Sequence, residues 1–195
     1  MARICRIVGI VLLVTATSAG VTMAQVDNGS GADKANMSVS DVFLFGTQTP
    51  VQPASSTLNR NKNSVEATVH TYGLVPDHVY TMWWAVFNDP KHCTAIPCGM
   101  SDLSIPKVKG SVLWATGRVA DARGQATLNA HLVASNPEGQ VVLGPGLLKP
   151  KKAEVHLLIR HHNEVGANGA TLQDQLTMLL AGCPCTNVQA AIHLP

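Results

Sequence analysis

Residues 64–87 read SVEATVHTYGLVPDHVYTMWWAVF, and this stretch decides the fold class. In its first part Val65, Ala67 and Val69 alternate with polar residues, which is the period of a half-buried β-strand. After a turn over 73–77, the segment 78–87 is apolar on both faces, which predicts a central strand covered on two sides. The stretch therefore predicts an antiparallel sheet with one strand buried on both faces.

The rest of the chain continues this pattern. Alternation predicts further strands over 39–45, 111–119, 125–132, 154–162 and 188–194. Residues 171–181 carry leucines at helical spacing before Gly182, and polar or Gly/Pro-rich segments predict loops over 47–63, 88–110 and 136–150. We expect an all-β domain, an antiparallel β-sandwich of the immunoglobulin/fibronectin-like or jelly-roll-like kind, with one short C-terminal helix.

The first 24 residues have the three-part plan of a secretory signal peptide. Two arginines precede an uncharged apolar run over 7–16, and small residues lead to a cleavage site after Ala24. The apolar run is short for a membrane span, and an uncleaved anchor is the alternative. We expect 1–24 to be a signal peptide, 25–38 a flexible lead-in and 39–195 a single domain, secreted or periplasmic and not in the membrane after cleavage.

The composition excludes some classes of protein. The 195 residues are 46% hydrophobic and 13% charged, which argues against a disordered chain. A formal charge of +2 gives no electrostatic case for nucleic-acid binding, and removal of the two signal-peptide arginines would take it to zero.

Four cysteines follow the expected signal peptide: Cys93, Cys98, Cys183 and Cys185. An even number in an oxidising compartment favours two disulfides. Because Cys183–Pro184–Cys185 would close a very tight ring, the favoured pairing joins the 93/98 pair to the 183/185 pair. A local Cys93–Cys98 bridge with a separate C-terminal bridge is the alternative, and a four-thiolate zinc site is a third interpretation with unusual spacing.

Histidine is the one surplus among the side chains that carry chemistry, with eight in the chain. His156 and His162 share one face of a predicted strand, and His161 or His193 would join them if the last strand pairs nearby. Imidazole ligands suit copper or zinc, so these four residues are the candidate metal ligands. The simpler interpretation is solvent-facing histidines without a ligand, because no H-x-H or H-x3-H pair is present.

The sequence lacks the motifs G-x-S-x-G, H-E-x-x-H and G-x-G-x-x-G and has no P-loop. Trp83 and Trp84 would serve as carbohydrate platforms if exposed, but their strand favours a core position. The leading hypothesis is an exported non-enzymatic interaction or structural module with an unknown protein or carbohydrate partner. The alternatives are a copper- or zinc-binding protein and an enzyme with an unrecognised site.

Residues 74–80, LVPDHVY, resemble the L-x-P-x-x-x-Y tyrosine corner of fibronectin type III-like sandwiches. In that family the tyrosine hydroxyl ties a corner of the sandwich to the backbone, so the resemblance implies a fold device at Tyr80. More broadly, 74–98, 111–132 and 154–193 look like segments of uncharacterised exported bacterial proteins, a group that implies no catalytic role. The 88–110 loop, the helix and the cysteines depart from fibronectin modules.

Overall fold

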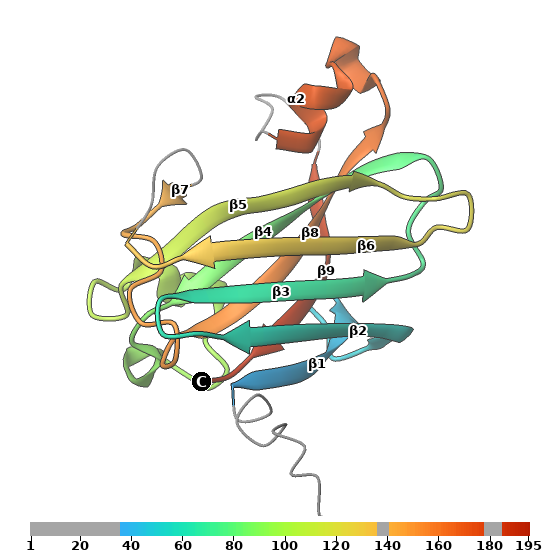
Figure 1. The fold of residues 1–195 in the computed structure, drawn as a ribbon. Coiled ribbons are helices and arrows are strands. Elements are labelled where there is room, and N and C mark those ends of the chain that lie inside the picture. Colours follow the sequence, from blue (N-terminus) through green and yellow to red (C-terminus); the bar gives the residue numbers. More distant parts are fainter. Residues whose placement is uncertain (1–35, 136–140, 178–184) are drawn as a thin grey trace, which may run out of the picture.

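A computed structural model describes residues 36–135, 141–177 and 185–195. Its antiparallel strands form one nine-stranded sheet in the order β6-β3-β2-β1-β9-β8-β4-β5-β7, curled into a half-barrel (Figure 1). The strands are β1 (Met37–Leu44), β2 (Pro50–Arg60), β3 (Ser64–Thr71), β4 (His78–Phe87), β5 (Gly110–Val119), β6 (Ala126–Val133), β7 (Val141–Leu143), β8 (Glu154–Glu164) and β9 (Thr186–His193). The helical elements are η1 (Pro90–His92), η2 (Met100–Ser104), η3 (Ala167–Gly169) and α2 (Leu172–Thr177).

The all-β prediction is confirmed, whereas the two-sheet sandwich is not. The strands form a single sheet, and its curl brings side chains from distant strands into one core. Leu58 and Val69 from one half pack in the same cluster as Trp84 and Leu157 from the other. The buried positions of Trp83 and Trp84 confirm that both belong to the core.

Strand β2 lies inside the predicted loop over 47–63, so that prediction is wrong. Proline cannot donate to a strand ladder, which is why the two prolines there indicated a loop. In the structure Pro50 is the first residue of β2, and Pro53 falls where the β1–β2 register shifts, between the paired residues Pro50 and Ser55. Strand β7 likewise lies inside the predicted loop over 136–150, while the expected helix corresponds to α2, its later residues being outside the described ones.

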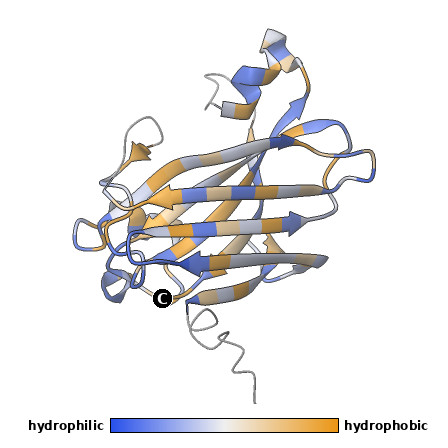
Figure 2. Cartoon of the chain, in the orientation of Figure 1, coloured by the Kyte–Doolittle hydropathy of each residue, from blue (hydrophilic) through white to orange (hydrophobic). Residues whose placement is uncertain are grey.

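The two halves of the sheet differ in what covers their outer faces. We call β6, β3, β2 and β1 the open arm, and β8, β4 and β5 the covered arm. On the open arm polar and apolar bands alternate (Figure 2). Outward residues there such as Glu66 and His70 are exposed. On the covered arm the outward residues Trp83, Ala85 and Phe87 are buried in a second core.

Two segments make this cover. The 88–110 segment, with η1 and η2, adds Cys98 and Val108 to the second core. At the other end α2 lies against β5, where the Trp114 Nε1–H donates to the Leu176 carbonyl at 3.0 Å. A Cβ atom on Gly117 would lie 2.5 Å from that carbonyl oxygen, so this close approach requires glycine.

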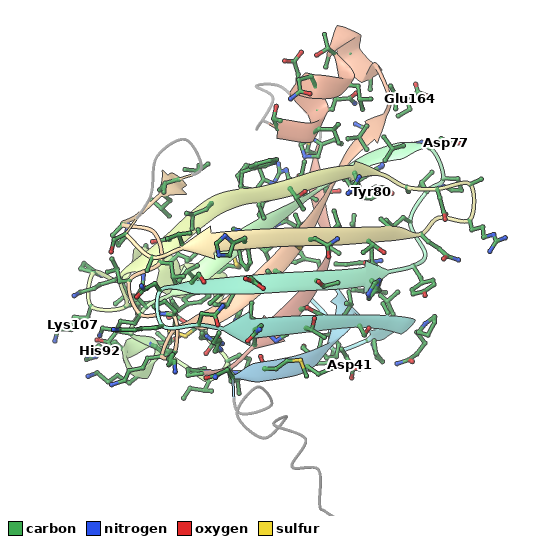
Figure 3. All side chains as sticks on the ribbon, in the orientation of Figure 1. Asp41, Asp77, Tyr80, His92, Lys107 and Glu164 are labelled. Carbon is green, nitrogen blue, oxygen red and sulfur yellow. A yellow bond between two sulfur atoms is a disulfide. The ribbon has the colours of Figure 1, made fainter. Side chains whose placement is uncertain are left out.

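A hydrogen bond fastens the turn that precedes β4. The Val75 N–H donates to the Tyr80 hydroxyl oxygen at 2.9 Å, and burial raises the pKa of Tyr80. Tyr80 and Asp77 lie at one end of the sheet, whereas His92 and Lys107 of the covering segment lie at the other (Figure 3). Among the described residues, no helix has the length and apolar character needed to span a membrane.

Candidate functional site: a groove beside a buried Glu–His pair

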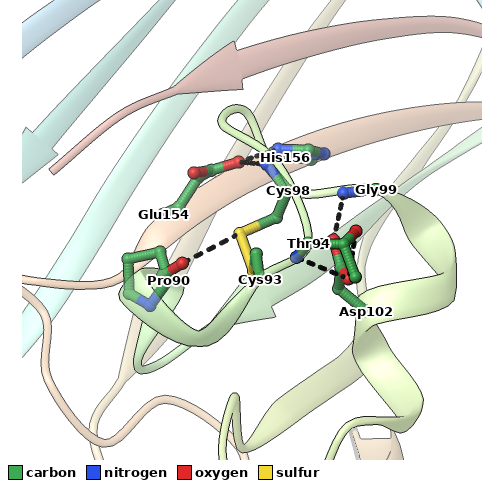
Figure 4. The surroundings of a disulfide bond; sticks show 8 residues. All are labelled: Pro90, Cys93, Thr94, Cys98, Gly99, Asp102, Glu154 and His156. Carbon is green, nitrogen blue, oxygen red and sulfur yellow. Dashed lines mark hydrogen bonds and ion pairs between the residues drawn. A yellow bond between two sulfur atoms is a disulfide. The ribbon is translucent and has the colours of Figure 1, made fainter.

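Strand β8 begins with a carboxylate and an imidazole on the same outer face. Glu154 and His156 are two residues apart, so the strand period directs both toward the covering segment. Glu154 Oε1 lies 2.6 Å from His156 Nε2, and the Cys98 N–H donates to the same oxygen at 2.6 Å (Figure 4). Because a carboxylate oxygen accepts, Nε2 carries a proton here, and in the neutral ring Nδ1 is then an acceptor.

The turn that presents the Cys98 N–H is held by a covalent bond and by a carboxylate. Cys93 and Cys98 form a disulfide. Asp102 accepts hydrogen bonds from the Gly99 N–H at 2.7 Å and from the N–H and hydroxyl of Thr94 (Figure 4). These hydrogen bonds, led by the one from Gly99, lower the pKa of Asp102, so the turn is fixed while Asp102 is ionised.

This bridge corrects the favoured cysteine pairing. Cys93 is joined to Cys98 and not to the C-terminal cysteines, so the local Cys93–Cys98 bridge of the alternative pairing is present. Cys185 is also disulfide-bonded, and Cys183 lies outside the described residues. The covering segment therefore closes on itself. Its attachment to the sheet rests on packing and hydrogen bonds.

A groove of about 790 Å³ opens beside the Glu–His pair, at the seam between the two arms. Its described lining residues come from β1 and the turn after it, from the covering segment, and from the outer faces of β8 and β9. They are Ser40, Phe43–Gln48, Pro97–Met100, His156, Leu158, Ala190, Ile192 and Leu194. None of them is Asp, Glu, Lys or Arg. The groove is thus mainly apolar, with one imidazole in its wall.

His162 lies on the same outer face as His156 but has its own partners. The Trp83 Nε1–H donates to Thr81 Oγ1 at 2.7 Å, and Thr81 Oγ1 lies 2.8 Å from His162 Nε2. The disulfide sulfur of Cys185, 3.3 Å from His162 Nδ1, has no proton, so Nδ1 donates to it and Nε2 of the neutral ring accepts from the Thr81 hydroxyl. Burial, helped by the neighbouring Arg160 charge, lowers the pKa of His162 to about 4, so the ring is neutral at pH 7.

His193 faces the opposite side of the sheet from His156, because its partner in β8 is Val155. Its ring nitrogens bond to Ser38 Oγ at 2.9 Å and Ser56 Oγ at 2.8 Å. Burial, together with the Arg60 charge, lowers the pKa of His193 to about 4. Arg60 itself is buried and donates to the carbonyls of Pro150, Ala153, His193 and Leu194.

His161 also points inward, opposite Tyr80. Its Nε2 lies 2.8 Å from Nδ1 of His78, and its ring stacks on those of His78 and Tyr80. Burial, with a smaller contribution from His78, lowers the pKa of His161. The structure therefore distributes the four candidate histidines over both faces of the sheet, and only His156 reaches the groove.

The four histidines are not brought together as metal ligands within the described part of the chain. The one group of three possible ligands found there is Cys93, Cys98 and Asp102, and its two sulfurs are already joined to each other. A metal site needs at least three ligand atoms around one ion. His162 and His193 use both ring nitrogens for other hydrogen bonds.

Sequence reasoning did not single out Glu154, Leu158 or Ile192. Glu154 and His156 carry a signal that was available, since a carboxylate and a histidine two apart in a strand share a face. Leu158 and Ile192 carry none, because their exposure to a groove depends on where the covering segment ends.

Comparison of the chain with protein-family models, with curated proteins and with solved structures finds no match.

Proposed function

We propose that this chain is an exported, non-enzymatic binding module of sandwich-like build whose ligand occupies the groove between the two arms. The observation that carries the proposal is a concave apolar surface into which one oriented imidazole projects. Small-molecule sites are commonly apolar hollows of several hundred Å³ with few polar groups, and this groove has that size and character. The signal-peptide pattern supports export.

The exposed side chains of the groove rim also favour binding. Leu44, Phe45, Met100 and Leu194 are each at least 37% exposed, and all four line this one groove. Single exposed apolar residues are ordinary, but convergence of several on one hollow is typical of a site that meets an apolar partner. A carbohydrate partner is less favoured, because Trp83 and Trp84 are buried and offer no stacking platform.

A copper- or zinc-binding function stays as the second hypothesis, without support from the placement of His156, His161, His162 and His193. An enzymatic role at His156 would need a nucleophile, and no described hydroxyl or thiol hydrogen-bonds to its Nδ1. Elemental analysis of protein purified without a histidine tag decides the metal question. Stoichiometric metal that survives dialysis would replace the binding proposal.

The test of the groove is binding of a fluorescent apolar probe, N-phenyl-1-naphthylamine, to the purified chain. Ile192→Trp places a large ring in the groove and is expected to weaken probe binding at least tenfold. Val39→Trp is the matched control, because Val39 is 67% exposed on the open arm and lines no part of the groove. Absence of binding, or equal effects of the two substitutions, would overturn the proposal.

A further inference from the structure

The imidazole of His156 offers the groove a nitrogen, Nδ1, that has no hydrogen-bond partner in the described part of the chain. His156 is only 5% exposed, and its Nε2 is committed to Glu154. Its Nδ1 bonds to no residue in the described part of the chain, and this atom is not sealed from solvent. In the neutral ring Nδ1 is therefore an acceptor that can be reached from the groove.

Contacts with Glu154 and Phe87 fix the orientation of the His156 ring. Glu154 holds the ring by Nε2, and the Phe87 ring packs against it with centroids 4.9 Å apart. A carboxylate on one imidazole nitrogen fixes the tautomer and makes the other nitrogen a better acceptor. The site thus offers one oriented acceptor among apolar walls.

The remaining lining restricts the charge of the ligand. A carboxylate or ammonium group entering the groove would lose hydration, and beside a neutral His156 ring no described lining residue carries a full opposite charge to replace it. A hydrocarbon alone would leave Nδ1 covered and unpaired, which costs free energy. An uncharged apolar molecule with one hydroxyl meets both conditions.

We propose that the groove binds an uncharged, largely apolar alcohol or phenol whose hydroxyl donates to His156 Nδ1. This inference rests on the proposed binding function and adds the chemical class of the ligand. A net hydrogen bond of ordinary strength corresponds to about 3- to 10-fold in affinity, so the preference for the hydroxyl is expected to have that size.

The test compares three probes of one shape: 2-naphthol, 2-methoxynaphthalene and 2-naphthoate. With the unaltered chain, calorimetry or probe displacement is expected to show 2-naphthol about 3- to 10-fold tighter than the methyl ether. The anionic naphthoate is expected to bind at least tenfold more weakly than 2-naphthol. His156→Phe is expected to remove the preference for 2-naphthol over the ether, while His131→Phe, on the exposed outer face of β6, is expected to keep it.

Because His156→Phe leaves Glu154 without its partner and so risks misfolding, a second measurement uses the unaltered chain. The ¹⁵N shift of His156 Nδ1 is expected to move with 2-naphthol and to stay in place with the ether. Equal affinity for 2-naphthol and the ether, with an unmoved Nδ1 signal, overturns this inference but leaves the binding function standing if Ile192→Trp still blocks both. No binding of any probe overturns both.

Discussion

The open arm and the covered arm are built from the same kind of strand, but the first is buried on one face and the second on both. In β3 the outward residues Glu66 and His70 are polar and exposed, so one face of the sheet suffices to bury its apolar side chains. In β4 nine of ten residues are buried, because the 88–110 segment and α2 cover the outer face. The groove lies where this cover ends. The candidate site therefore lies at the boundary between the arms and is formed by residues of both.

The largest expected difference between the arms is in packing. Phe87→Ala removes a fully buried ring from the second core and is expected to lower the free energy of unfolding by about 3–5 kcal/mol. Val39→Ala on the open arm is expected to change it by less than about 0.5 kcal/mol, because Val39 is exposed. Urea denaturation measures both. Similar losses at the two sites would show that the arms do not differ in this way.

The second difference is in acid sensitivity, through His162 of the covered arm. Its pKa is about 4 in the folded chain against 6.5 when unfolded, so acid favours the unfolded state. Its contribution is full above about pH 6.5 and is lost progressively as the pH falls to about 4, amounting to about 3 kcal/mol.

His162→Gln is expected to flatten the dependence of the free energy of unfolding on pH in this window, which a urea series at several pH values detects. His70→Gln, on the exposed face of β3, is the matched control and is expected to leave the slope unchanged. His193, whose pKa is also lowered to about 4, is expected to keep part of the slope. An unaltered slope in His162→Gln would mean that His162 is not one of the groups that resist protonation.

A third, smaller difference concerns the cover itself. Replacing both Cys93 and Cys98 by alanine opens a short loop, and the chain-entropy view puts the loss of unfolding free energy at about 2 kcal/mol. The same variant is expected to weaken probe binding in the groove, because the Cys98 N–H would no longer be held against Glu154. Weaker stability with unchanged probe affinity would show that the groove does not depend on the disulfide.

The smallest effect is expected on the open arm. Thr68 Oγ1 donates to Asn129 Oδ1 at 2.9 Å between exposed side chains. Thr68→Val removes this hydrogen bond where water can replace it and keeps the β-branched shape, so thermal denaturation is expected to show a change in the free energy of unfolding below about 0.5 kcal/mol. A larger loss would show that water does not replace this hydrogen bond as expected.

Much of the fold could be predicted because strand period is a local signal. The alternation of Val65, Ala67 and Val69 predicted β3, and the two-sided apolar segment predicted both β4 and the burial of Trp83. Strand β2 was not predictable in the same way. Its inward positions include Ser56 and Arg60, which are buried because they bond to His193 and to backbone carbonyls far away in the sequence.

The site was predictable only in part. The parity of β8 placed His156 and His162 on one face, as the structure confirms. It could not show that His193 faces the other way, since that depends on the register of β9 against β8. The partners of Glu154 and His162 include residues outside β8: Cys98 is 56 residues from Glu154, and Thr81 is 81 residues from His162. Contacts between residues so far apart cannot be predicted from the alternation of residues within one strand.

The position of β9 has a consequence for the order in which the sheet can be completed. Among the nine strands β9 comes last in the chain, yet it lies in the middle of the sheet, between β1 and β8. During synthesis the strands of two part-sheets, β6-β3-β2-β1 and β8-β4-β5-β7, would leave the ribosome first. The two parts pair through β9 alone, so they stay separate until Thr186–His193 emerges. Among the described strands, the sheet therefore stays in two parts until the last one has been made.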